Sequence, residues 1–188
     1  MILVGSSGGA RICIDVLRRY PQLVEGAVLS EPPVFALAPA IAEEFMARVK
    51  PAVGKALDSG DPTAAVDAFF TIIDPAFWAG APDERKQAYR ANLRAMMADL
   101  QMPTYQLTTA DLARIERPCL VLYGSASLPW FQDIARIVAG AIPDCRLIER
   151  AGAGHATYAT RPSEFATAVR EFAESTRTAH STHPGRQL

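Results

Sequence analysis

A serine framed by glycines near the start of the chain, in Gly5-Ser6-Ser7-Gly8-Gly9, has residue types that could do chemistry. The segment fits the pattern G-x-S-x-G, in which the central serine, here Ser7, stands at a sharp turn from strand to helix and acts as a nucleophile. Small residues are expected around it, because side chains at positions 5 and 9 would collide in so tight a turn. The start of the following helix would offer N–H groups to a developing oxyanion.

The same glycines could instead cradle a phosphate. A dinucleotide fingerprint needs G-x-G-x-x-G after a strand and an acidic residue about 20 residues further on, where Glu31 stands. The glycines here are spaced G-x-x-G-G, so the glycine that packs the helix against the strand is missing. A Walker A loop needs Gly-Lys-Ser/Thr, and Arg11 does not supply it. The spacing therefore favours the nucleophile over a nucleotide-binding domain.

A serine nucleophile needs a general base, and the sequence has three histidines: His155, His180 and His183. The last two lie in a polar segment, residues 175–188, for which we expect disorder. His155 lies in GAGHATY, a loop after the last expected strand, and it follows Ser7 in the order found with G-x-S-x-G motifs. With one histidine in the part expected to fold, no metal site is predicted.

Strands and helices alternate around these residues. Apolar runs predict strands over residues 2–4, 26–30, 119–124 and 145–150. The last of these alternates like a strand near a sheet edge. Helical periodicity, resting for the first helix on Ile12 and Val16, predicts helices over residues 9–19, 129–141 and 162–174. This alternation implies an α/β protein with a parallel sheet between helices.

The segment between the second and third strands has no strand pattern and is too long for a simple crossover. It indicates successive helices, one ending at Pro51 and another running from Asp83 to Pro103. We interpret it as a helical cap at the carboxyl edge of the sheet, where α/β active sites lie. Its large side chains would form the core of the cap and partly line a hydrophobic pocket over Ser7: Phe35, Phe45, Phe69, Phe70, Phe77, Trp78, Met96, Met97 and Tyr105. The expected division is 1–33 (core), 34–116 (cap), 117–174 (core) and 175–188 (tail).

Composition limits the classes of partner. The chain has 188 residues, of which 49% are hydrophobic, as in one globular domain. A formal net charge of −1 gives no reason to expect nucleic acid or a membrane surface as a partner. No apolar run reaches membrane-spanning length, and no signal segment opens the chain. Three widely spaced cysteines suggest reduced thiols and hence a cytoplasmic protein: Cys13, Cys119 and Cys145.

Taken together, the chain resembles the C-terminal portion of an α/β-hydrolase-fold protein of the esterase/lactonase/haloperoxidase-like type. The resemblance rests on three stretches in the right order: VGSSGGA with RRYPQLVEGAVLSEPP, RPCLVLYGSASLPWF, and ERAGAGHATYATRPSEFATAVREF. It implies a partial α/β-hydrolase fold and a serine hydrolase acting on an ester-like carbonyl without a cofactor. By this resemblance Ser7 is the nucleophile, His155 the general base, and the backbone N–H of Gly8 one oxyanion donor.

The resemblance leaves the catalytic acid open. Most relatives have an aspartate a few residues after the third strand, where this sequence has Ser127. Some lipase-type members take the acid from the end of the second strand, where Glu31 stands. Asp133 in the next helix is another candidate, and a Ser–His pair without an acid is a third alternative.

The resemblance also implies strands before residue 2 and a loop with a second oxyanion donor. Their absence from the sequence predicts an apolar sheet edge at residues 2–4, through which the chain could associate with itself. The expected protein is therefore either a shortened form of a longer enzyme or a non-catalytic interaction module with this fold.

Overall fold

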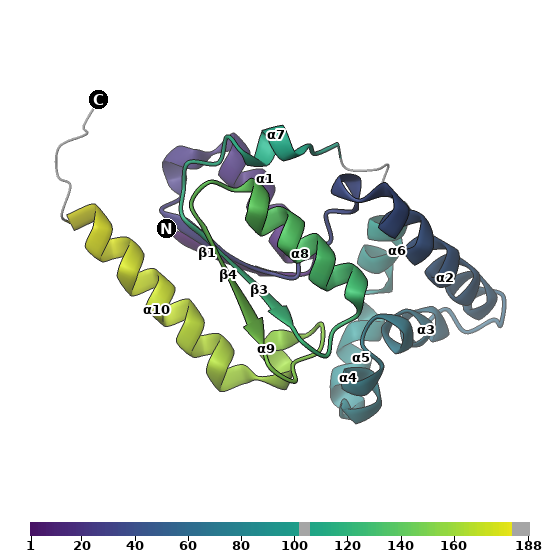
Figure 1. Cartoon of the computed structure of the whole chain (residues 1–188). Helices are drawn as coiled ribbons and strands as arrows, with labels where there is room; N and C mark the ends of the chain where they lie inside the picture. Colours follow the sequence, from purple (N-terminus) through teal and green to yellow (C-terminus); the bar gives the residue numbers. More distant parts are fainter. Residues whose placement is uncertain (102–105, 182–188) are drawn as a thin grey trace.

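The computed structural model describes residues 1–101 and 106–181, so Tyr105 and His183 lie outside the described residues. Its four strands form one parallel sheet in the order β1-β2-β3-β4 (Figure 1). They are β1 (Ile2–Ser6), β2 (Gly26–Ser30), β3 (Cys119–Gly124) and β4 (Cys145–Arg150). The last three have the predicted bounds, β1 is two residues longer than predicted, and β4 lies at a sheet edge as its alternating pattern indicated.

Helices cover both faces of the sheet. α1 (Gly8–Arg19) and α8 (Pro129–Ala141) pack on one face, and α10 (Pro162–Ser181) packs on the other. The alternation of side chains along a strand sends Ala27 and Leu29 of β2 toward α1 and α8, and Val28 toward α10. Side chains of β3 alternate between the two faces in the same way. Because helices cover both faces, every residue of β2 and β3 is buried, as is typical of parallel sheets.

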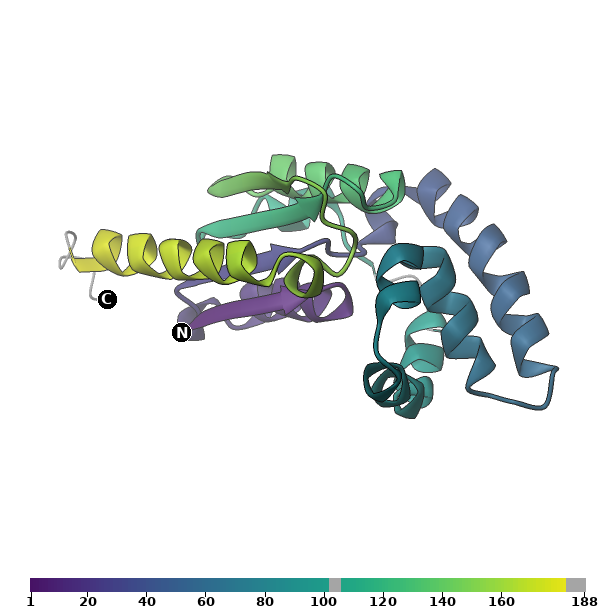
Figure 2. The same cartoon turned by 90° about the horizontal axis from the view of Figure 1, so that it is seen from below.

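Five helices between β2 and β3 form the expected cap. They are α2 (Pro39–Leu57), α3 (Ala64–Ile73), α4 (Pro75–Gly80), α5 (Asp83–Ala91) and α6 (Leu93–Gln101). Figure 2 shows them beyond the carboxyl ends of the strands. Phe45 of α2 packs against Trp130 and Phe131 at the start of α8, so the cap shares a hydrophobic core with the sheet domain.

Short helical turns complete the chain. They are η1 (Pro21–Leu23), η2 (Phe35–Leu37), α7 (Thr109–Leu112) and α9 (Thr157–Thr160). Segments of this length show too few turns for hydrophobic periodicity to predict them. α9 follows directly after the loop that carries His155.

Two predicted helix boundaries in the cap are wrong. α2 does not end at Pro51 but continues to Leu57, because Val49 and Val53 on either side of the proline are both buried and keep the helix on the core. The predicted helix from Asp83 is interrupted at Asn92, which separates α5 from α6, and its N-cap is Pro82. Pro103 lies outside the described residues.

The C-terminal helix is longer than predicted. α10 runs to Ser181, so the disorder expected from residue 175 is wrong for residues 175–181. Thr176 is buried, and its hydroxyl donates a hydrogen bond to the carbonyl oxygen of Phe172 at 2.9 Å. The burial of Thr176 favours the longer helix, although serine and threonine have a lower helix propensity than alanine.

Two large hydrophobic side chains, one on α1 and one on the edge strand β1, are exposed. Ile12 of α1 is 64% exposed, although its spacing helped to predict the helix, and the buried positions of α1 include Ile14 and Leu17. Val4 on β1 is 46% exposed, in agreement with the expected apolar edge. Self-association through the β1 edge stays a prediction.

Across the described ranges, no helix has both the length and the hydropathy needed to cross a membrane.

The turn between β1 and α1 depends on Gly5. A Cβ there would lie 2.5 Å from the carbonyl oxygen of Gly9, which no side chain tolerates. The sequence also predicted that a side chain at position 9 would collide in the turn. This prediction is wrong, because a Cβ on Gly9 would meet nothing within 4 Å. Only one of the two flanking glycines is therefore required by close approach of the backbone.

Gly5→Ala should lower the free energy of unfolding by more than about 2 kcal/mol, because the new methyl group overlaps the backbone of Gly9. Gly9→Ala is the matched control, and it should change that free energy by less than about 1 kcal/mol. Urea denaturation followed by circular dichroism measures both. Equal stability of the two variants would contradict this description of the turn.

Candidate active site

Ser7 lies at the turn from β1 into α1. Its backbone is in the left-handed region at φ 52°, and its N–H donates a hydrogen bond to the carbonyl oxygen of Ser30 at 2.8 Å. Serine often caps helix N-termini through its side chain, but Ser7 makes no such bond. Its Oγ instead lies 3.0 Å from Nε2 of His155.

His155 lies in the loop between β4 and α9 and is 5% exposed. Its Nδ1 is 2.5 Å from Oε2 of Glu31, and its ring packs on Phe131 with the ring centroids 4.0 Å apart. A carboxylate only accepts hydrogen bonds, so Nδ1 carries a proton and donates it. In the neutral ring Nε2 is then the acceptor, facing the hydroxyl of Ser7.

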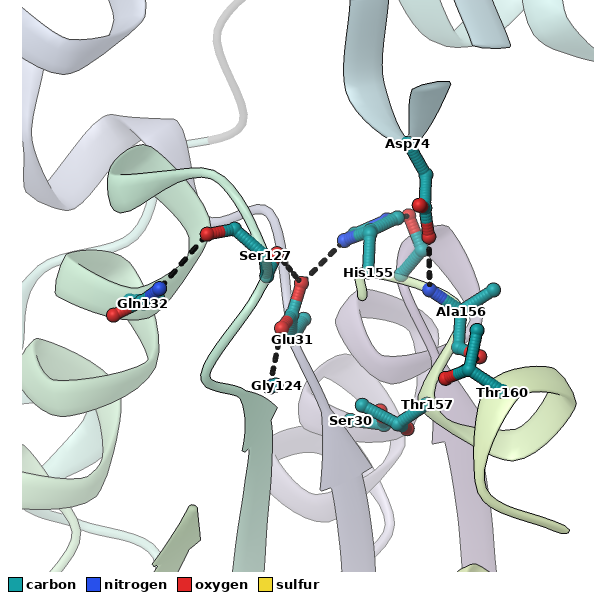
Figure 3. Close-up of polar contacts among 11 residues, drawn as sticks. Ser30, Glu31, Asp74, Gly124, Ser127, Gln132, His155, Ala156, Thr157 and Thr160 are labelled. Carbon is teal, nitrogen blue, oxygen red and sulfur yellow. Dashed lines mark hydrogen bonds and ion pairs between the residues drawn. The ribbon is translucent and has the colours of Figure 1, made fainter. Parts of the chain in front are cut away.

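Glu31 follows the last residue of β2 and is completely buried. Besides His155, its carboxylate accepts hydrogen bonds from the backbone N–H of Gly124 and the hydroxyl of Ser127, both at 2.7 Å (Figure 3). A buried carboxylate is costly unless its oxygens are bonded, and here it has three donors, two from the end of β3 and the turn after it and one from the loop after β4.

Of the three alternatives for the acid, the structure brings Glu31 to His155. Ser127, in the position where the resemblance implies an aspartate, is bonded to Glu31. Asp133 faces solvent on α8 with 54% of its side chain exposed, and it pairs with Arg136 at 2.9 Å. The structure thus places Ser7, His155 and Glu31 in one chain of hydrogen bonds and leaves Asp133 outside it.

Gly124, the last residue of β3, is needed for this arrangement. A Cβ on Gly124 would overlap the carbonyl oxygen of Ala153 and lie 2.6 Å from its carbonyl carbon. The missing side chain lets the loop before His155 cross the end of β3. In this arrangement the backbone N–H of Gly124 donates its hydrogen bond to the carboxylate of Glu31.

Backbone strain is concentrated at this site. Within the described ranges, Ser7 and Glu31 are the two non-glycine residues with positive φ, at 52° and 45°. Such conformations cost about 1–3 kcal/mol each and persist where the surroundings enforce them. Here both follow parallel strands directly, so the strain turns each side chain over the carboxyl edge of the sheet.

A cavity of about 580 Å³ opens beside Ser7, within the size range of small-molecule sites. Its apolar wall comes largely from the cap residues named above: Phe35, Phe45, Phe69, Phe70, Phe77 and Met96. Gly8 and Arg11 from α1 line it next to Ser7. Arg11 donates a hydrogen bond to Asp99 of α6 at 2.7 Å, which ties the cap to the helix that begins at the serine turn.

Sequence reasoning missed the contacts between the cap and the His155 loop. Asp74, between α3 and α4, accepts a hydrogen bond from the backbone N–H of Ala156, and the hydroxyls of Tyr89 and Tyr158 lie 2.7 Å apart. The sequence does mark Asp74 as the start of a helix, because Asp at the N-cap is followed by Pro75 at the first helical position, but nothing in it indicates the bond to Ala156.

The cysteines lie apart from this site. All three are free, and burial raises the pKa of the Cys145 thiol to about 11. Burial likewise raises the pKa of Cys119 and Cys13, so the three are protonated at neutral pH and are poor nucleophiles. In the part of the chain that the structure describes, no group of three or more His, Cys, Asp or Glu residues could hold a metal ion.

Sequence comparison identifies the class of protein. The model of the Alpha/beta hydrolase family matches residues 2–168, which is most of the chain. The chain therefore belongs to the α/β hydrolase family. No curated protein matches it significantly in sequence.

Solved structures with this fold include several bacterial proteins. MenH from S. aureus has a TM-score of 0.69 at 20% identity, and the match covers 94% of this chain and 68% of that one. Esterase RhEst1 from Rhodococcus sp. ECU1013 has a TM-score of 0.68 at 21% identity, covering 93% and 65%. Carboxylesterase CesB from Bacillus subtilis has a TM-score of 0.67 at 19% identity, covering 92% and 59%. The chain thus spans about two thirds of the length of these proteins, and the likeness shows a common fold.

Ser127→Ala should lower the free energy of unfolding by about 1–3 kcal/mol, because it removes one of the donors to the buried carboxylate of Glu31. Ser125→Ala serves as the control, since Ser125 is exposed and its hydroxyl accepts a hydrogen bond from the N–H of Gly152 rather than serving a buried charge. It should cost less than about 1 kcal/mol. Chemical denaturation measures the free energy of unfolding of both variants. A loss in Ser127→Ala no greater than that in Ser125→Ala would contradict this role of the Ser127 hydroxyl.

Proposed function

We propose that this protein is a serine hydrolase that cleaves an ester-like bond through an acyl-enzyme. The observation that carries the proposal is the chain of hydrogen bonds from Ser7 Oγ through the His155 ring to Glu31, at 3.0 and 2.5 Å. A serine bonded to a base that is in turn bonded to an acid activates the serine hydroxyl as a nucleophile on several unrelated folds. The site also opens into a pocket large enough for a small substrate.

In the proposed reaction, Ser7 Oγ attacks the carbonyl carbon while Nε2 of His155 takes the hydroxyl proton. The imidazolium gives this proton to the leaving oxygen when the ester bond breaks, and the acyl group stays on Ser7. Water then attacks the acyl carbon, and His155 accepts a proton from the water and returns it to Ser7. Glu31 keeps the proton on Nδ1 and stabilises the imidazolium in both steps.

The oxyanion formed in each attack needs hydrogen-bond donors. Gly8 begins α1 and lines the pocket beside Ser7. The first N–H groups of a helix have no acceptor within the helix, and the dipole favours negative charge there. We therefore assign one oxyanion contact to the backbone N–H of Gly8.

The pocket indicates a hydrophobic acyl group as the substrate part that the cap binds. Its wall is mostly aromatic and aliphatic, with Phe45 and Phe70 among the lining residues. Burial of such a group contributes about 25 cal/mol per Å² of apolar surface. Esters of small or medium hydrophobic acids are therefore the proposed substrates.

Ser7→Ala should abolish hydrolysis of p-nitrophenyl esters and covalent labelling by a fluorophosphonate, because the attacking oxygen is gone. Both are measured on the whole protein, with Ser6→Ala as the neighbouring control that keeps the nucleophile. Full labelling of Ser7→Ala would contradict the assignment. Failure of the folded wild type to label would favour the non-catalytic interaction module instead.

Glu31→Gln should lower kcat strongly, because a neutral amide no longer favours the protonated ring of His155. The equivalent change of the acid in a Ser-His-Asp protease costs about 10⁴ in kcat. Asp133→Asn, the matched control on the exposed face of α8, should leave kcat unchanged. The reverse pattern would show that the acid has been assigned to the wrong residue, and kcat unchanged in both would leave a Ser–His pair.

A further inference from the structure

Asp74 connects the cap to the loop that carries His155. It lies between α3 and α4, is 5% exposed and borders the pocket. Its Oδ2 accepts a hydrogen bond from the backbone N–H of Ala156 at 2.9 Å, and its Oδ1 accepts one from the N–H of Phe77 at 3.3 Å. Figure 3 shows the carboxylate reaching from the cap to the backbone next to His155.

Asp74 also contacts the loop on the other side of His155. A Cβ on Gly154 would lie 2.7 Å from each carboxylate oxygen of Asp74, so any side chain at position 154 would displace this carboxylate. The carboxylate therefore touches the residues immediately before and after the histidine. It is placed to fix the backbone from which the imidazole ring projects.

Asp74 does not act on the ring itself. Nδ1 of His155 is bonded to Glu31 and Nε2 to Ser7, so both ring nitrogens already have partners. On the sheet side, the same loop is held by Thr157, whose hydroxyl lies 2.7 Å from that of Ser30, both completely buried. The His155 loop is thus fixed to β2 through Thr157 and to the cap through Asp74.

We propose that Asp74 is a positioning residue, through which the cap holds His155 between Ser7 and Glu31. The inference rests on the proposed serine-hydrolase function. It makes the cap part of the proton-transfer apparatus as well as the wall of the binding pocket. A residue that only shaped the pocket would change KM, whereas a residue that positions the base changes kcat.

Asp74→Ala in the whole protein should lower kcat on the order of 10²-fold with little change in KM, because a shift of about 1 Å in a catalytic group costs this much. Backbone amide exchange should become faster in residues 151–160. Asp74→Asn keeps an oxygen that can accept from Ala156 and should restore most of kcat. Asp61→Ala is the matched control, because Asp61 is also a cap aspartate that accepts from a backbone N–H, that of Thr63, but it is exposed and lies in the loop before α3.

Gly154→Ala tests the same contact from the opposite side. Its methyl group would push against the carboxylate of Asp74 and should lower kcat in the wild-type background. In the Asp74→Ala background the methyl group has room, so the double variant should be no slower than Asp74→Ala alone. Such non-additivity is the signature of two residues that act through one contact.

The outcomes separate this inference from the proposed function. If the folded wild type is neither labelled by the fluorophosphonate nor hydrolyses esters, the proposed hydrolase function is wrong. Amide exchange in Asp74→Ala still tests whether Asp74 fixes the backbone of residues 151–160. Unchanged exchange and kcat in Asp74→Ala overturn the inference, as does an equal loss of kcat in Asp61→Ala. If Asp74→Ala does not fold, Gly154→Ala decides, and its unchanged kcat overturns the inference.

Discussion

The hydrogen bond between His155 Nδ1 and the buried carboxylate of Glu31 is the interaction on which the site depends. It joins the loop after β4 to the end of β2, two segments that are 124 residues apart in the chain. A buried carboxylate with a missing partner would cost several kcal/mol, so the surrounding backbone must deliver all of its donors. The backbone N–H of Gly124, at the end of β3, and the hydroxyl of Ser127, in the turn that follows, supply two of these donors.

The sheet supplies the rigidity that this arrangement needs. Ser7 and Glu31 each follow a strand and turn sharply into the left-handed region, which is unfavourable for residues with a side chain. Each is held by its own N–H, which donates to the neighbouring strand at Ser30 for Ser7 and at Leu122 for Glu31. The parallel ladder thus continues one residue beyond each strand, and its hydrogen bonds offset the strain.

The predictable parts of the structure were those that depend on local pattern. The strands of the sheet and the helix over 129–141 were predicted from apolar runs and periodicity, and the signal is strongest for β2 and β3, which are buried on both faces. The order of Ser7, Glu31 and His155 along the chain, together with the family resemblance, indicated the candidate site.

Features set by tertiary contacts were not predictable from the sequence. Burial of Val49 and Val53 carries α2 through Pro51, and burial of Thr176 extends α10. The exposure of Ile12 shows that spacing predicts a helix more safely than it predicts the buried face. Asp74 was missed because its partner, the N–H of Ala156, is 82 residues away and has no signature in the sequence.

The most direct test of the proposed chemistry is to search for the acyl-enzyme itself. The whole protein would be mixed with a p-nitrophenyl ester, quenched in acid during turnover and digested, and the peptides would be weighed by mass spectrometry. We predict that the mass of the acyl group appears on Ser7. Ester turnover with no acyl group on Ser7, or with the acyl group on another residue, would contradict the relay of Ser7, His155 and Glu31.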